Sequence, residues 1–458
     1  MVLPFYCLIF CNGSFSFINK RFLKMRLLLL SFWVFQYMLV CNKIVKGSLF
    51  YYCCMSLLMV VVIFFCGEKS ITFYVFFELS LIPTLIIVFF FGYQPEKLQA
   101  GIYLLMYTVF SSLPLLLLFL RNRVYIIFMR HELFWWYRLI LTLGFRVKTP
   151  LYIVHVWLPK AHVEAPVAGS IVLAGILLKL GRYGFILFCP HLRNSILILY
   201  VYLSLLGAIY CSLICLRNFD IKSLIAYSSV VHMGVVTVGV VRGSEIGYKC
   251  ALIIVIAHGV CSPFLFALAY YLYISRHSRV ISCNKGFASL PIMAFLGFFL
   301  LAVNMGVPPS INLWSEVLIF LSLIELMKNA IFFLFLIAFL GVIYNLFMYV
   351  RVSQRKESFY EKGCVGVWPF FSSVVLSFII WVSVGFFWKM YEIWSCVILK
   401  LPKFIFRETW GPGWKLIEKK RKGEKLLNAI SITFTLFRLS PVFVEVTGDK
   451  NKKAFNLY

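Results

Sequence analysis

The sequence predicts an all-α, polytopic membrane helical bundle with about 12–13 spanning helices, because its apolar runs are long enough to cross a bilayer. Hydrophobic residue types make up 62% of the 458 residues, charged types only 13%, and the mean hydropathy is +0.93. Soluble domains carry about a quarter charged residues. The runs also lack the alternation of membrane-barrel strands. These observations exclude a soluble enzyme, a disordered chain and a disulfide-stapled secreted module.

The spanning segments follow one another from near the N-terminus to about residue 398. Residues 1–17 could add a further span, but Asn12-Gly13-Ser14 interrupts that run. The predicted spans are 23–42, 48–66, 70–92, 100–120, 134–157, 165–188, 195–216, 223–242, 248–274, 288–327, 329–350 and 366–398.

Two of these segments contain helix breakers. Segment 288–327 is too long for one ordinary span and has Pro308-Pro309 in its middle, and segment 134–157 has Pro150. Proline removes a backbone donor, and a broken membrane helix is tolerated only where protein or water covers the freed carbonyls. Each broken segment carries an ionisable residue, Lys148 or Glu316. This pattern predicts a transporter-like chain of two structurally related halves.

The net charge of +27 does not indicate nucleic-acid binding. The basic residues cluster between apolar runs, where they flank spanning helices and meet anionic lipid head groups. After about residue 399 the chain contains a basic run at 419–422 and a strand-like alternation at 430–436. We therefore expect residues 399–458 to lie outside the hydrocarbon, on the membrane surface or on a neighbouring subunit.

Four charged residues deep inside apolar runs are the main candidates: Glu78, Lys148, Lys179 and Glu316. Glu325 also lies in an apolar run, and a position at a helix end is expected for it. Each of the four would cost about 3 kcal/mol at the bilayer centre if it faced lipid. We therefore expect them to face one another or water, along one polar axis. Static ion pairs are one interpretation. A proton relay is the other, because buried lysine and glutamate can both exchange protons near neutral pH.

Histidines are further candidates for such a relay. His232 and His258 lie within apolar stretches, where a histidine can also be an ordinary core residue. His155, His162 and His277 are expected at interfaces. No two histidines have the HxxxH spacing of a metal site, so no metal site is predicted.

Several motifs carry a family resemblance: VKTPLYIVHVWLPKAHVEAPVAGSIVLAGILLKLGRYG at 147–184, DIKSLIAYSSVVHMG at 220–234, IAHG at 256–259, GVPPSINLWSE at 306–316, and FFELSLIPT with YQPEKLQAGIYLLMYTVFSSLPLLL within 76–117. Together they resemble the subunit 4 family of respiratory complex I, the proton-pumping NADH:ubiquinone oxidoreductase, in its mitochondrially encoded form. The resemblance covers about residues 70–350.

The resemblance implies an antiporter-like fold with two inverted five-helix repeats and a proton path through buried charges. It implies that Glu78, Lys148, Lys179 and Glu316 are the four relay residues of the family. It also implies that this chain holds no redox cofactor, and that NADH, FMN, iron–sulfur clusters and ubiquinone bind to other subunits. Neighbouring antiporter-like subunits and membrane lipids, with cardiolipin as a candidate, are the implied partners in the mitochondrial inner membrane, and no nucleic acid is expected.

The chain departs from the family in two ways. Only 69 residues precede the helix of Glu78, so one or two N-terminal spans are expected to be missing. Arg182 stands where the family has a small residue, one helical turn after Lys179, where its like charge would disfavour protonation of that lysine. The expected organisation is N-terminal spans at 1–69, an antiporter-like core at 70–350, a last span with its connection at 351–398 and a basic extension at 399–458.

Two other functions remain open from the residues. A subunit of a multi-protein cation/proton antiporter with no redox link would carry the same fold and charges. A structural scaffold would be expected to have lost one or more of the four charged residues, and all four are present.

Overall fold

A computed structural model describes residues 48–67, 69–92, 94–121, 135–189, 194–241, 243–286, 291–308, 310–324 and 330–353, with scattered positions between 24 and 35. Within these ranges every regular element is a helix, apart from an isolated β-bridge between Asp220 and Val280. The predicted span at 366–398, the extension at 399–458 and most of the predicted span at 23–42 lie outside the described residues. The total number of spans predicted from the sequence is therefore not tested.

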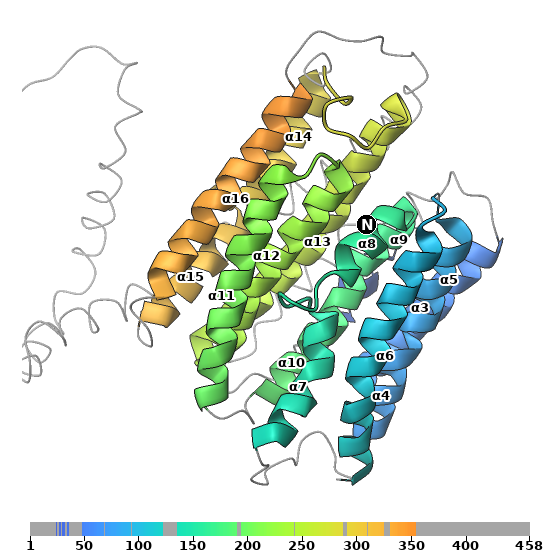
Figure 1. The fold of residues 1–458 in the computed structure, drawn as a ribbon, viewed down its shortest axis with the longest axis vertical. Coiled ribbons are helices and arrows are strands. Elements are labelled where there is room, and N and C mark those ends of the chain that lie inside the picture. Colours follow the sequence, from blue (N-terminus) through green and yellow to red (C-terminus); the bar gives the residue numbers. More distant parts are fainter. Residues whose placement is uncertain are drawn as a thin grey trace, which may run out of the picture. The chain divides into compact units, whose positions relative to one another are not determined.

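The first part of the bundle runs from α3 to α10 (Figure 1). Its elements are α3 (Ser48–Cys66), α4 (Ser70–Leu79), α5 (Leu81–Phe91), α6 (Lys97–Arg121), α7 (Trp135–Lys148), α8 (Trp157–Glu164), α9 (Val167–Val172), the π-helical turn η2 (Leu173–Leu177) and α10 (Leu178–Phe188). The pairs α4–α5 and α9–α10 each form one span, because single hydrophobic stretches at Ser70–Phe91 and Val167–Phe188 run through them.

The second part runs from α11 to α16. Its elements are α11 (Asn194–Arg217), α12 (Ile221–Val241), α13 (Glu245–Arg276), α14 (Pro291–Met305), α15 (Ile311–Ile324) and α16 (Ala330–Ser353). Among the described residues, eight helices are long and apolar enough to cross a membrane, and α14 and α15 supply shorter apolar helices. The predicted all-α, polytopic bundle is therefore confirmed.

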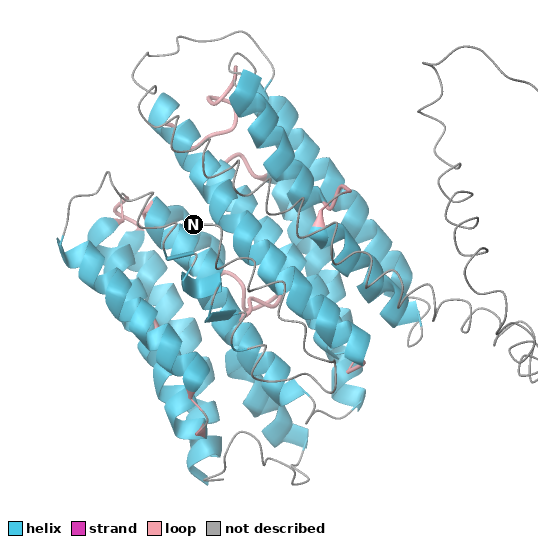
Figure 2. Cartoon of the chain, turned by 180° about the vertical axis from the view of Figure 1, so that it is seen from behind, coloured by secondary structure: helices cyan, strands magenta, loops and turns pink. Residues whose placement is uncertain are grey.

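Both predicted helix breaks are present. The helix ends at Lys148 and resumes at Trp157, and it ends again at Met305 and resumes at Ile311. Irregular backbone consequently lies part-way along the bundle as well as at its ends (Figure 2). The predicted end of the first broken segment, at residue 157, was wrong. Residues 149–156 form the non-helical break, so helix α8 begins only at Trp157 and continues to Glu164.

The element order repeats with these breaks. In each part the broken span is the fourth of five: α3, α4–α5, α6, α7/α8 and α9–α10, then α11, α12, α13, α14/α15 and α16. Because five is an odd number, a second set that follows directly begins from the opposite side of the membrane. This order agrees with two inverted five-helix repeats, which we call the first and second halves.

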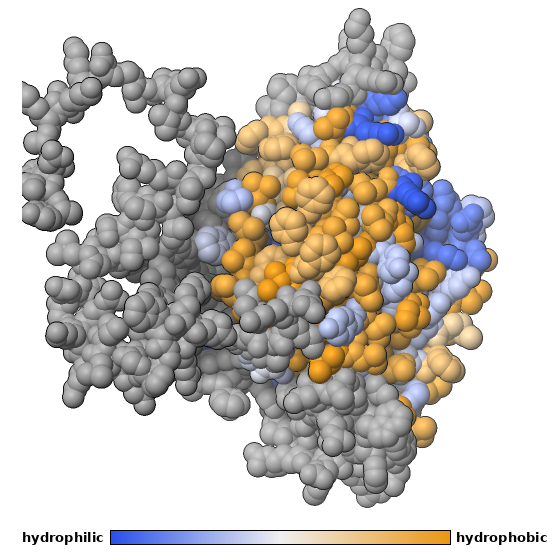
Figure 3. All heavy atoms as spheres, turned by 60° about the vertical axis from the view of Figure 1, so that its left-hand side comes forward, coloured by the Kyte–Doolittle hydropathy of each residue, from blue (hydrophilic) through white to orange (hydrophobic). Residues whose placement is uncertain are grey.

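The spans differ in how far the protein covers them. About nine-tenths of the Val167–Phe188 and Ile221–Val241 spans is buried (94% each), and 83% of Gly247–Ile274, against 33–50% of the other candidate spans. Figure 3 shows a broad hydrophobic surface on one face, with hydrophilic residues gathered mainly toward one end and one edge. The central spans are therefore shielded by the rest of the bundle, while the outer spans carry exposed apolar side chains such as Phe90, Phe110 and Phe335.

Helix α13 joins the two halves. It packs against α9, η2 and α10 of the first half, and against α12, α14 and α15 of the second half. A polar residue on this helix can therefore contact side chains from both halves.

Candidate functional site

The break after α7 is closed by a side chain. Pro150 has no amide hydrogen, and Ile153 adopts a positive φ of 82°, so the helical ladder cannot continue. The indole Nε1 of Trp157 donates a hydrogen bond to the carbonyl of Val147 at 3.0 Å. A carbonyl left free inside a membrane protein needs such a donor. The break thus holds Lys148, the last residue of α7, at a fixed place in the bundle.

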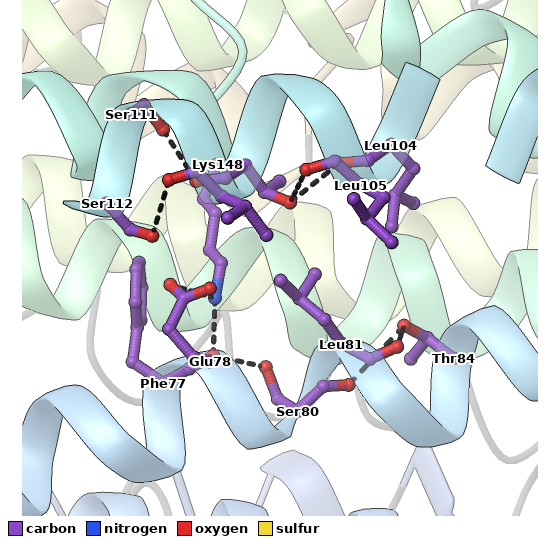
Figure 4. Close-up of polar contacts among 12 residues, drawn as sticks. Phe77, Glu78, Ser80, Leu81, Thr84, Leu104, Leu105, Ser111, Ser112 and Lys148 are labelled. Carbon is purple, nitrogen blue, oxygen red and sulfur yellow. Dashed lines mark hydrogen bonds and ion pairs between the residues drawn. The ribbon is translucent and has the colours of Figure 1, made fainter. Parts of the chain in front are cut away.

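Lys148 pairs with Glu78 (Figure 4). Its Nζ lies 3.7 Å from Oε1 of Glu78, donates to the backbone carbonyl of Phe77 and sits 3.3 Å from the centre of the Phe77 ring. Lys148 is 3% exposed, whereas the Glu78 side chain is 20% exposed. The ammonium is thus held by a carboxylate, a carbonyl and an aromatic face, all of which stabilise its charge.

Lys179 lies in the next span, on α10, directly after a local change in helix winding. The π-helical turn η2 ends at Leu177, and Nζ of Lys179 donates to the carbonyl of Ala174, five residues earlier. Single π-helical turns inside α-helices often occur at functional sites. Lys179 is 1% exposed, and Nδ1 of His258 on α13 lies 3.4 Å from its Nζ. No carboxylate is paired with Lys179 among the described ion pairs.

Two glycines allow close packing around these lysines. A Cβ at Gly181 would lie 2.9 Å from Cβ of Lys148, so α10 passes directly over the break in α7. A Cβ at Gly259 would lie 3.0 Å from Cε of Lys179, so the turn of α13 next to His258 leaves room for the lysine stem. Both contacts are tighter than most side chains permit.

Arg182 is buried beside Lys179, as its position in the sequence predicts. It is 3% exposed, and its Nη2 donates to the carbonyl of Met233 on α12 at 2.8 Å. Its Nε has no hydrogen-bond partner in the described part of the chain. The guanidinium therefore links α10 to α12 next to His232 and adds a positive charge between Lys179 and the second half.

His232 and Glu316 form the pair of the second half. Nδ1 of His232 lies 3.4 Å from Oε1 of Glu316, and its ring centre is 5.7 Å from that of His258. A cavity of about 20 Å³ adjoins the pair, lined by His232, Asn304, Glu316, Tyr344 and apolar side chains. A cavity of this volume holds about one water molecule.

The break before α15 positions Glu316. Gly306 adopts a positive φ of 76°, and a Cβ there would lie 3.4 Å from Oε2 of Glu316. The amide of Asn312 donates to the carbonyl of Val303 at 3.1 Å and so covers a backbone group near the break. Glycine provides the left-handed turn and the space for the carboxylate.

The structure therefore brings the six sequence-predicted residues into three pairs: Glu78 with Lys148, Lys179 with His258, and His232 with Glu316. Carboxylate, amine and imidazole groups can each accept and release a proton. Among the described contacts, no hydrogen bond joins Lys148 to Lys179 or His258 to His232. A proton would cross these two gaps through water or through side-chain movement.

Sequence reasoning misplaced two histidines and missed two polar residues. His155, expected at an interface, is buried within the first break at 7% exposure. His162, expected at an interface, is wholly buried and stacks on Phe266 with ring centres 4.7 Å apart, because α8 turns inward after the break. Asn304, which contacts His232, and Asn345, which contacts Asn304, were not singled out as site residues. The position of Asn304 beside the Pro308 break was the only available signal, and no signal marked Asn345.

Comparisons with known proteins identify the family. Residues 68–343 match the family described as NADH:quinone oxidoreductase/Mrp antiporter. NADH-ubiquinone oxidoreductase chain 4 of Ceratitis capitata is 40% identical over 372 residues, covering 78% of this chain and 83% of the relative. This chain belongs to the chain 4 family. Chain 4 of Albinaria caerulea is 42% identical over 313 residues, which cover 65% and 71% of the two chains.

Solved structures show the same fold as this chain 4 family member. A chain of respiratory complex I from Thermus thermophilus with bound NADH is 25% identical, with a TM-score of 0.69 over 80% of this chain and 82% of that one. A chain of the Mrp complex from Dietzia is 15% identical, with a TM-score of 0.65 over 75% and 68%. The second likeness shows the fold alone.

Proposed function

We propose that the protein is a proton-translocating membrane-arm subunit of respiratory complex I, working in the mitochondrial inner membrane. It would couple NADH:ubiquinone oxidoreduction on other subunits to proton movement through its own buried residues. The chain 4 relatives support the assembly. The observation that carries the proton role is the arrangement of Glu78, Lys148, Lys179, His258, His232 and Glu316 as three buried pairs across the two halves.

Each pair has its own part in the proposed relay. Glu78 stabilises the ammonium of Lys148, so separation of this pair would make the lysine proton available. Lys179 and His258 would hold the proton where α13 joins the halves. Water in the adjoining cavity would then carry it to Glu316 and to Nδ1 of His232, which would exchange it between them.

The redox groups belong to other subunits in this proposal. NADH, FMN, iron–sulfur clusters and ubiquinone would bind elsewhere in the complex. Neighbouring antiporter-like subunits would cover part of the apolar surface, and lipids, with cardiolipin as a candidate, would cover the rest.

A second candidate is a cation/proton antiporter subunit with no redox link. The fold shared with the Mrp complex chain favours it, but at 15% identity that likeness concerns fold only. Isolation of the chain within an NADH-oxidising assembly would exclude this alternative.

Replacement of Lys179 by Met tests the relay. Methionine fills the same buried space without a titratable group, so the complex should assemble while proton translocation, measured in vesicles, falls on the order of 100-fold. NADH oxidation coupled to it should fall as well. Lys97→Met is the matched control, because Lys97 lies at the start of α6 and donates to the carbonyl of Gly92. Assembled Lys179→Met complexes that translocate protons at the control rate would refute the proposal.

A further inference from the structure

A series of hydrogen-bonded side-chain amides, which we call the amide chain, ends on His232. Its Nε2 lies 3.1 Å from Oδ1 of Asn304, the second-last residue of α14. Nδ2 of Asn304 donates to Oδ1 of Asn345 on α16 at 3.1 Å, and Nδ2 of Asn345 donates to the carbonyl of Gly341 at 2.9 Å. The three residues are at most 6% exposed. The amide chain thus connects α12, α14 and α16 in the interior of the second half.

The far end of this chain sets the direction of every hydrogen bond in it. The carbonyl of Gly341 can only accept, so the group of Asn345 that faces it must be the amide NH₂. The oxygen of Asn345 then faces Asn304 and requires a donor there, which leaves the oxygen of Asn304 facing His232. Because that oxygen can only accept, Nε2 of His232 must carry a hydrogen.

The proton-exchanging atom of His232 follows from this assignment. A neutral imidazole carries one hydrogen, so Nδ1 is its free acceptor. Nδ1 is also the nitrogen that faces Oε1 of Glu316 at 3.4 Å, beside the cavity of about 20 Å³. The nitrogen able to gain and lose a proton therefore points toward the carboxylate and the space for a water molecule.

We propose that Asn304 and Asn345 are positioning residues that lock His232 in the Nε2–H tautomer, so that it exchanges protons only through Nδ1 on its Glu316 side. The role of this exchange in proton translocation rests on the function proposed above, whereas the tautomer itself does not. A proton cannot pass through the ring from Nε2 to Nδ1 unless the Asn304 amide rotates, and that rotation would break its bond to Asn345.

The remaining polar groups around His232 do not replace this lock. The ring of His258 on α13 lies 5.7 Å away between centres, and Arg182 on α10 reaches the carbonyl of the next residue, Met233. Glu316 on α15 faces Nδ1, and Tyr344 on α16 lines the same cavity. Among the described residues, only Asn304 forms a hydrogen bond with Nε2.

Infrared difference spectroscopy of intact complexes with isotope-labelled histidine tests the assignment, because the two neutral tautomers have different ring vibrations. The His232 band is identified as the one lost in His232→Gln. We expect the Nε2–H form in the unaltered protein. Asn304→Leu should convert part of the signal to the Nδ1–H form and lower proton translocation roughly two- to tenfold, the effect of about one hydrogen bond. Asn345→Leu should shift the signal in the same direction by a smaller amount.

Asn312→Leu is the matched control. It removes another buried asparagine at the same helix break, whose amide bonds to the carbonyl of Val303 instead of to His232. This variant should leave the His232 signal in the Nε2–H form.

A Nδ1–H signal in the unaltered protein would overturn the proposal, as would an unchanged signal in Asn304→Leu. If Asn304→Leu fails to assemble, the unaltered protein and Asn345→Leu decide in the same way. Normal proton translocation in His232→Gln, with the expected tautomer in the unaltered protein, would instead refute the relay role of His232 and leave the lock standing.

Discussion

Each half contains a broken helix, but different side chains surround the break. In the first half the break ends α7 at Lys148, and an indole from Trp157 covers a freed carbonyl. In the second half the break precedes α15, which carries Glu316, and an asparagine amide from Asn312 covers the carbonyl. The broken span thus contributes a lysine, Lys148, in the first half and a glutamate, Glu316, in the second half.

The partners of these residues differ as well. Lys148 contacts Glu78, a carbonyl and an aromatic ring, all of which favour a charged lysine. Glu316 faces a histidine whose other nitrogen is held by Asn304, beside a cavity with room for water. In the proposed relay, the first half would therefore hold charge as an ion pair, and the second half would exchange protons through Nδ1 of His232.

Loss of the ion pair between Glu78 and Lys148 should have the largest effect on proton translocation. Lys148→Met should lower proton translocation on the order of 100-fold, because no titratable group would remain at the break. Lys148→His should retain more translocation, since imidazole can still exchange a proton with Glu78. Both are measured as proton uptake by vesicles during NADH oxidation. Equal rates in the two variants would contradict the view that a titratable group at residue 148 is what matters.

Loss of the side-chain donor at either helix break should have a smaller effect, which we expect on thermal stability. Trp157→Phe and Asn312→Leu each leave a buried carbonyl without its donor, which costs about 1–3 kcal/mol. Thermal unfolding of the assembled complex should therefore begin at lower temperature in both variants. The double variant should show the sum of the two losses, because the breaks lie in different halves. An unchanged unfolding temperature in either single variant would show that water or another donor covers that break.

Arg182→Met should have the smallest effect on stability. The substitution removes one hydrogen bond to Met233 but also removes a buried charge with an unpartnered Nε. Replacement of buried charged groups by apolar ones of similar volume is often neutral or stabilising. We expect an unfolding temperature at or above that of the unaltered complex. A marked loss would show that the link from α10 to α12 holds the halves together.

The sequence predicted the parts of this site that depend on one segment at a time. Charged residues inside apolar runs and prolines inside long spans are local signals, and both breaks were confirmed. The pairing of Lys179 with His258, the inward turn that buries His162 and the π-helical turn before Lys179 depend on how α8, α10 and α13 pack. The amide chain through Asn304 and Asn345 joins residues far apart in sequence, so no spacing rule could predict it.

In the function proposed above, the two halves form one relay that is joined where Lys179 meets His258. The most direct measurement is the rate of proton translocation into vesicles by complexes carrying His258→Leu, with His277→Asn at the left-handed end of α13 as the control. We expect the same fall in this rate as in Lys179→Met, and no further fall when both substitutions are combined. A normal rate in assembled His258→Leu complexes would contradict this relay.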